Sequence, residues 1–206
     1  MTGSTLFKRL LLTSASMIFA ANTWAADLAL EVYNPGATAV FPVTSVLVSG
    51  EKEVVLVDAQ FGKSQAEQVV QKIRASGKQL TTIYISHGDP DYYFGLETLT
   101  AAFPDAKVLA SAPTVEHIKH TMDGKLKYWG PILKGDAPSK AIVPQVLKGD
   151  SLTLEGKRLQ IIGLDGPQPD RSFVWIPSIK AVVGEWHTRM ATEFGDDALV
   201  APWAAR

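Results

Sequence analysis

The order of the apolar segments is the feature that most constrains this fold. Strand and helix patterns alternate up to about residue 128, and only strand patterns follow residue 144. In the first part we expect strands at 29–33, 39–49, 53–57, 81–85 and 107–110, and helices at 64–76, 96–103 and 111–128. After a loop at 130–144 that is rich in Pro and Gly, we expect strands at 145–147, 151–154, 158–162, 172–176 and 181–183. A mixed α/β half followed by an all-strand half predicts a sheet-on-sheet core with helices outside.

Short local motifs mark some ends of these segments. Gly-Glu-Lys at residues 50–52 is typical of a hairpin turn between two strands. Ser64 and Glu67 have the spacing of a capping box, which predicts that a helix starts there, and Gly77 is suited to its end.

The first 25 residues have the pattern of a secretory signal peptide. Lys8 and Arg9 precede an apolar run at 10–21, and Thr23 and Ala25 are the small residues that a signal peptidase reads. We therefore expect cleavage after Ala25 and export to the periplasm or the medium. The alternative is an uncleaved anchor, although an apolar core of about a dozen residues is short for a membrane span.

Composition limits the kinds of partner. The chain has 206 residues, 46% of them hydrophobic and 20% charged, which predicts one globular domain. It has no cysteine, so an exported form has no disulfide, and any metal site must use His, Asp, Glu or water. Loss of the signal peptide moves the net charge from −1 to about −3, and no basic patch for nucleic acid is evident. We expect a small-molecule substrate, with neither nucleic acid nor membrane as a partner after cleavage.

A cluster of polar side chains follows the apolar run at 82–85. His87, Asp89 and Asp91 lie within five residues, beside Gly88 and Pro90. Imidazole and carboxylate both bind zinc-like ions, so a short loop at a strand end that carries them suits a divalent cation. The alternative is an ordinary polar turn, with Gly88 and Pro90 setting the bend.

The order of several motifs resembles the metallo-β-lactamase superfamily. Val55-Leu56-Val57-Asp58, a helix, and then Ile83-Tyr84-Ile85-Ser86-His87 with Asp89, Asp91 and Tyr92 follow one another as in that family. The segments 149–154 and 174–184 continue in the same order, so the resemblance covers residues 32–185. It implies an α/β fold of the αββα sandwich type, with one or two divalent metal ions such as zinc or manganese at the edge of the sheets. We find no pattern that matches the superfamily's last strand and helix, so we expect a shortened sandwich over 26–186 and an irregular tail at 187–206.

The resemblance also implies a ligand set, and this chain departs from it. The superfamily loop reads His-x-His-x-Asp-His, where His87 and Asp91 match and Asp89 and Tyr92 replace two histidines. Glu185 stands in place of the bridging aspartate. The predicted metal ligands are therefore His87, Asp89, Asp91 and Glu185. Such an oxygen-rich set binds more weakly than three histidines and favours manganese, magnesium or calcium over zinc.

Other residues receive supporting roles by the same resemblance. Asp58 is expected to support the loop by hydrogen bonding, Tyr92 to orient a substrate oxygen, and Asp165 or Asp170 to reach the site from the loop before residue 172. His117 and His120 stand at i and i+3 on an expected helix and could share an ion, against the simpler interpretation of surface histidines. His187 could also approach the site. Trp129 is expected in a loop, as a core or rim aromatic that could line a pocket.

The predicted activity is hydrolysis of an ester, lactone or amide by a metal-activated water, with an acyl-homoserine lactone as one candidate substrate. His87 would hold the ion, and Asp91 would act as the general base. The alternative is a catalytically inactive or truncated domain that keeps the sandwich as a binding protein.

Overall fold

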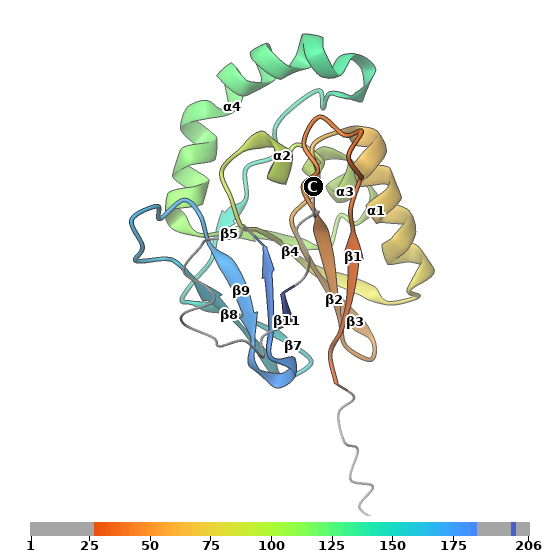
Figure 1. Ribbon diagram of the computed structural model, residues 1–206, viewed down its shortest axis with the longest axis vertical. Helices are drawn as coiled ribbons and strands as arrows, with labels where there is room; N and C mark the ends of the chain where they lie inside the picture. Colours follow the sequence, from red (N-terminus) through yellow and green to blue (C-terminus); the bar gives the residue numbers. More distant parts are fainter. Residues whose placement is uncertain (1–26, 185–198, 201–206) are drawn as a thin grey trace, which may run out of the picture.

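Two β-sheets pack face to face in the computed structural model, which describes residues 27–184 and 199–200 (Figure 1). The first sheet has the order β1-β2-β3-β4-β5-β6. Its strands are β1 (Ala29–Tyr33), β2 (Ser45–Ser49), β3 (Glu53–Val57), β4 (Gln79–Ile85), β5 (Lys107–Ala110) and β6 (Gln145–Val146). The strands β1, β2 and β3 pair antiparallel, and β3 to β6 pair parallel.

The second sheet has the order β11-β10-β9-β8-β7. Its strands are β7 (Ser151–Leu154), β8 (Lys157–Ile162), β9 (Phe173–Ile176), β10 (Ala181–Gly184) and β11 (Leu199–Val200). All of its pairs are antiparallel except β10 with β11.

The helices belong mainly to the first half of the chain. They are α1 (Lys63–Ala75), α2 (Pro90–Tyr93), α3 (Leu96–Ala102) and α4 (Ala112–Leu133), with 3-10 turns η1 (Lys134–Asp136) and η2 (Pro177–Ile179). Within the described residues, no helix combines the length and the apolar character that a bilayer span requires.

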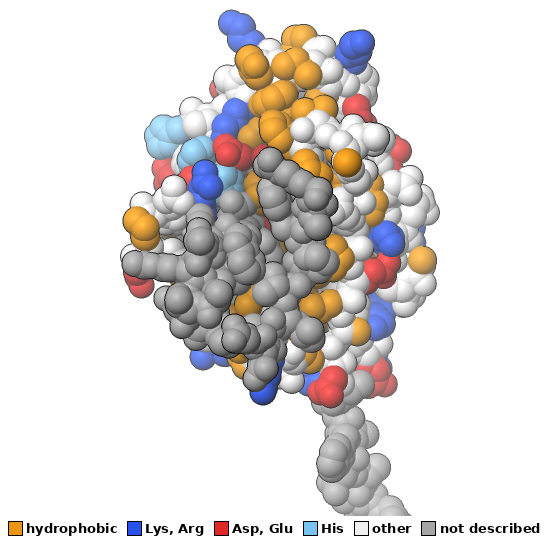
Figure 2. Space-filling model, in the orientation of Figure 1, with side chains coloured by type: hydrophobic (Ala, Val, Ile, Leu, Met, Phe, Trp, Pro, Cys, Tyr) orange, Lys and Arg blue, Asp and Glu red, His pale blue; other side chains and the backbone are white. Residues whose placement is uncertain are grey.

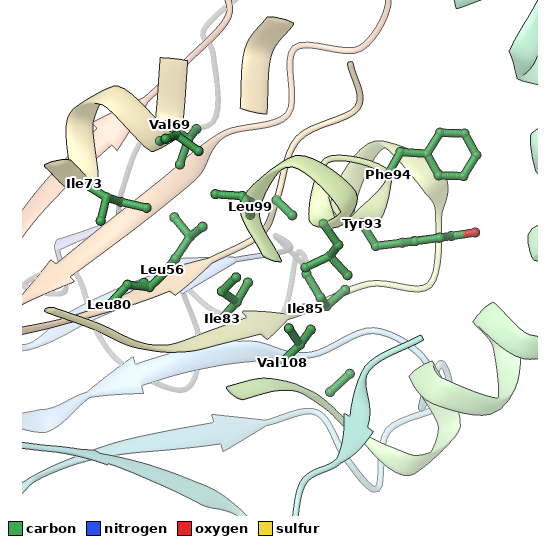
Figure 3. Close-up of a cluster of buried hydrophobic side chains, with 14 of the residues drawn as sticks. Leu56, Val69, Ile73, Leu80, Ile83, Ile85, Tyr93, Phe94, Leu99 and Val108 are labelled. Atoms are coloured by element: carbon green, nitrogen blue, oxygen red, sulfur yellow. The ribbon is translucent and has the colours of Figure 1, made fainter. Parts of the chain in front are cut away.

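The alternation of side chains along β3 explains how the first sheet joins two cores. Val54 and Leu56 face the layer of α1 and α3, whereas Val55 and Val57 face the second sheet. Figure 3 shows the first core, where Leu56 and Ile83 lie beneath the helix residues, including Leu99. These valines and leucines are fully buried. The burial of apolar surface is the main force that holds the layers together.

The core between the sheets takes apolar side chains from strands in both halves of the chain. Val46 and Tyr84 of the first sheet pack in one cluster with Leu159, Val174 and Val183 of the second sheet. The expected α/β sandwich of two packed sheets is therefore confirmed.

The far face of the second sheet carries a small separate cluster of Phe173 and Val182, packed with Ile162 and Trp175. No helix of the described ranges contributes to this cluster. The expected absence of a last strand and helix concerns the chain after Gly184, of which only β11 is described. The predicted signal peptide at 1–25 lies outside the described residues, and so does the predicted tail apart from Leu199–Val200.

Several predicted element ends are wrong. The strand expected at 39–49 begins only at Ser45, because Pro42 cannot donate a hydrogen bond to a sheet. The helix expected from Ser64 has Gly62 at its N-cap, where the Gly62 N–H donates to Gln65 Oε1 at 3.0 Å. The N–H of Ser64 instead donates to Asp136 at 2.6 Å.

The helix expected to end near Tyr128 continues through Gly130 and Pro131 to Leu133. Trp129 anchors this last part, because its ring packs edge-on against Phe41 and Phe61 at centroid distances of 5.2 Å. Trp129 is therefore a helix residue in an aromatic cluster, and the prediction that it lies in a loop is wrong.

Candidate functional site

The candidate site begins where two neighbouring parallel strands end. Asp58 follows β3, and Ser86 follows β4. The Asp58 side chain, which is buried, accepts hydrogen bonds from the N–H of Ser86 through Oδ1 and from the Ser86 hydroxyl through Oδ2, both at 2.8 Å. Asp58 itself has φ of +65°, a conformation that asparagine and aspartate tolerate better than most residues. This geometry agrees with the expected supporting role of Asp58.

Residues just before the second sheet's strand β9 also bind this loop. The N–H of Ser172 donates to the Ser86 carbonyl at 2.9 Å, and His87 forms an isolated bridge with Arg171. The hydroxyls of Ser172 and Tyr84 lie 2.8 Å apart in a hydrogen bond. The loop at 86–92 is thus held at the edge where both sheets meet.

His87 is buried, with only 2% of its surface exposed. Its Nδ1 accepts a hydrogen bond from the N–H of Asp89 at 2.9 Å. A neutral imidazole then carries its proton on Nε2, and this atom is buried with no hydrogen-bond partner among the described residues. Burial lowers the pKa of His87 to about 4, although the charge of Asp89 opposes the shift. At neutral pH, His87 is therefore an uncharged donor, with the Tyr92 ring 4.8 Å away.

The Asp89 carboxylate binds a lysine from α4. Lys125 Nζ donates to Asp89 Oδ1 at 2.9 Å, to the Gly88 carbonyl at 2.9 Å and to His117 Nε2 at 3.0 Å. Partial burial works to raise the pKa of Asp89, but the hydrogen bond and charge of Lys125 outweigh it and hold this pKa below its ordinary value. No sequence pattern had pointed to Lys125.

His117 connects this lysine to the loop before β9. Its Nδ1 lies 3.0 Å from Asp170 Oδ2, so the proton sits on Nδ1 and the lone pair of Nε2 faces Lys125. The His117 ring also packs so closely on Gly88 that a Cβ there would lie 2.9 Å from it. Histidine side chains accordingly gather with basic and acidic groups on one face of the molecule (Figure 2).

The remaining candidates lie in different surroundings. Asp91 is a partly buried residue of α2. Asp165 is exposed on the loop between β8 and β9 and makes no hydrogen bond or ion pair with another described residue. His120 Nδ1 pairs with the Glu116 carbonyl of its own helix at 2.7 Å, so His117 and His120 have separate partners. The predicted ligand Glu185, and His187, lie outside the described residues.

The described residues do not fit a preformed metal centre. No three His, Asp or Glu side chains of residues 27–184 come together in a way that could hold a metal ion. The lone pair of His87 Nδ1 faces a backbone donor, and its Nε2 carries the ring proton. One oxygen of Asp89 is bound to an ammonium group. The predicted roles of His87, Asp89 and Asp91 as ligands stay predictions.

The fold, and the site at the edge where the two sheets meet, define a class of protein. It is a two-sheet α/β sandwich with a polar loop after a parallel strand. Residues 38–183 match the family model of the metallo-β-lactamase superfamily. The chain belongs to that superfamily, and the match includes the whole 86–92 loop.

Individual relatives are more distant. The uncharacterized protein YobT of Bacillus subtilis (strain 168) is 40% identical over 73 residues, which span 35% of this chain and 31% of YobT. The metallo-β-lactamase of Pontibacter korlensis is 19% identical, with a TM-score of 0.54 over 76% of this chain and 70% of that one. The DIM-1 metallo-β-lactamase is 18% identical, with a TM-score of 0.53 over 77% and 69% of the two chains. At these identities the solved structures show a common fold alone.

Proposed function

We propose that this protein hydrolyses an ester, lactone or amide bond of a small molecule at the edge where residues 86–92 meet residues 170–172. Membership of the metallo-β-lactamase superfamily supports this reaction class. The observation that carries the proposal is the pair of Asp170 and His117, whose 3.0 Å contact orients an imidazole beside the loop.

The proton acceptor in this proposal is His117. The Asp170 carboxylate at Nδ1 fixes the tautomer and leaves the lone pair on Nε2, as a general base requires. This lone pair accepts a hydrogen bond from Lys125 at 3.0 Å, so a substrate must displace the lysine before His117 can take a proton. His87 is less suited to this task, because its proton lies on Nε2 and its Nδ1 accepts from a backbone N–H, that of Asp89. The sequence-based role of Asp91 as general base stays an alternative within the same reaction.

His87 can instead donate a hydrogen bond. Its Nε2–H has no partner within the described residues, and a buried donor without a partner costs free energy that a bound oxygen would recover. A water is therefore its natural partner in this structure, and a substrate carbonyl would have to reach a buried atom. Because the ring is neutral, this donor would act without adding a charge to the site.

A panel of esters, lactones including an acyl-homoserine lactone, and amides tests the reaction. Each substrate is assayed after chelation and again with added zinc or manganese. We expect turnover, and we expect His117→Ala to lower kcat by about 10²–10⁴-fold, the usual contribution of a general base. His120→Ala is the matched control, since it removes an exposed histidine one turn along the same helix. Turnover that survives in His117→Ala would rule out this base, and no turnover in any condition would rule out the hydrolase.

A second candidate function is small-molecule binding without turnover. It is favoured by one observation, that Lys125 already satisfies Asp89 and His117. A substrate that raises the melting temperature and remains intact after long incubation would identify a binding protein.

A further inference from the structure

We propose that the ammonium group of Lys125 is the resident cation of this site and occupies the place of a divalent metal ion. The inference concerns ion binding, and it stands whether or not the protein hydrolyses a substrate.

Three acceptors converge on one atom, Lys125 Nζ. Gly88 and Asp89 come from the loop after β4, and His117 comes from the first half of α4, yet all three place an acceptor 2.9–3.0 Å from Lys125 Nζ. An ammonium group has three N–H donors, so Lys125 is fully satisfied. An oxygen-rich set around one positive charge is also what a hard cation binds.

The two acceptor side chains lie close together. Asp89 Oδ1 and His117 Nε2 are 4.0 Å apart, and Lys125 Nζ contacts both. A carboxylate and an imidazole lone pair are both metal ligands when they are free. Here each is already a hydrogen-bond acceptor, so a metal ion must first displace Lys125.

Lys125 is partly shielded from water. Its side chain is 18% exposed and that of Asp89 is 43% exposed, whereas that of Lys119 on the same helix is 51% exposed. An ion pair that is partly shielded from water keeps more of its attraction than one on the surface. Asp170 extends the network, because it holds the His117 ring with Nε2 directed at the ammonium group.

His87 does not complete a metal site in this arrangement. Its Nδ1 accepts from the Asp89 N–H, and a metal ion at Nε2 would require the ring proton to move to Nδ1, opposite that donor. The same N–H that fixes the Asp89 backbone therefore disfavours His87 as a ligand.

Lys125→Met tests the proposal, because methionine resembles lysine as far as Cε and lacks the ammonium group and its charge. Zinc and manganese are titrated into the chelated, full-length proteins by calorimetry and by thermal melting. We expect the wild type to show no binding and no rise in melting temperature. We expect Lys125→Met to gain binding of one ion, with a higher melting temperature when the ion is present. Lys119→Met is the matched control and should behave as the wild type.

Two results would overturn the proposal. One is tight binding of zinc or manganese by the wild type, since the titrated protein also includes Glu185 and His187. The other is a folded Lys125→Met protein that binds neither ion. If Lys125→Met folds only with metal, the proposal is supported.

If Lys125→Met does not fold under any condition, the proposal can still be tested directly on the wild type. The ¹⁵Nζ resonance of Lys125 should be observable, because its protons are held in hydrogen bonds, and it should be unchanged by added zinc. Loss or displacement of that signal by zinc would overturn the proposal. Lys125→Arg keeps the charge and should bind neither ion, and a gain of metal binding by this variant would count against a resident cation.

Discussion

Gly95 lies so close to Ala59 that a Cβ at residue 95 would be 1.9 Å from the Ala59 carbonyl oxygen. The N–H of Gly95 also donates to the Gln60 carbonyl at 2.9 Å, so its backbone cannot retreat without losing a bond. This contact joins the segment after β3 to the start of α3.

We expect Gly95→Ala to destabilise the fold by on the order of 3 kcal/mol or more, because a backbone atom must move. Gly124→Ala is the matched control, since Gly124 lies in α4 with no atom within 4 Å of an added Cβ. That control should stabilise the protein by up to ~1 kcal/mol through helix propensity. Urea unfolding of both variants measures the difference, and equal stabilities would contradict the close contact.

The burial of His87 predicts a specific sensitivity to acid. Its pKa in the folded protein, about 4, is below the ordinary value of 6.5, so the unfolded chain takes up more protons between these values. The free energy of unfolding should therefore fall as the pH drops from about 6.5 to about 4, by roughly 3 kcal/mol in total. His87→Gln should remove this part of the pH dependence, whereas His120→Gln should keep it. Urea unfolding at a series of pH values checks this, and parallel curves for the wild type and His87→Gln would refute it.

Glu155, in the turn between β7 and β8, should cause a second loss of stability in acid, at a lower pH than that of His87. Its carboxylate accepts hydrogen bonds at 2.6–2.8 Å from the N–H groups of Lys52, Glu51 and Glu53, and these bonds hold its pKa below the ordinary value of 4.5. A lowered pKa means stabilisation that is present above pH 4.5 and is lost as the pH falls through the folded-state value.

Glu155→Gln should therefore lower the melting temperature at neutral pH, and the difference from the wild type should shrink in acid. Glu116→Gln is a surface control that removes only an exposed pair with Lys119. A difference that persists unchanged at low pH would show that the carboxylate charge is unimportant.

We also propose that the protein is exported and that the signal peptide is cleaved after Ala25. Intact-mass measurement and N-terminal sequencing of the exported fraction should give a chain that starts at Ala26. Replacement of Ala25 by a bulky phenylalanine should leave the precursor uncleaved, because signal peptidases require a small residue there. Full-length wild-type protein confined to the cytoplasm would disprove the proposal.

The fold could be predicted well because its signals are local. The apolar runs at β3 and β4 and the order of motifs were sufficient for the two-sheet sandwich. The resemblance implied that Asp58 supports the loop by hydrogen bonding, and its side chain accepts from the N–H of Ser86 in the structure.

The charge network of the site could not be predicted in this way. Lys125 is one of several lysines on α4, and only tertiary packing shows that it is turned toward Asp89. From the sequence, Asp165 and Asp170 had the same expected role, that of reaching the site from their loop. In the structure Asp170 contacts His117, whereas Asp165 is exposed. The helix end was mispredicted for a related reason, since the packing of Trp129 outweighs the helix-breaking tendency of Pro131.

The hydrogen bonds that build the site join residues far apart in sequence, and this affects the order in which the protein folds. Lys125 reaches its acceptors across 36 and 37 residues of sequence, and Tyr84 reaches Ser172 across 88. Contacts of long sequence separation form late, because the intervening chain must first lose its entropy. We therefore expect the central strands to gain protection from hydrogen exchange first, and the site to assemble in the final step, when the second sheet docks.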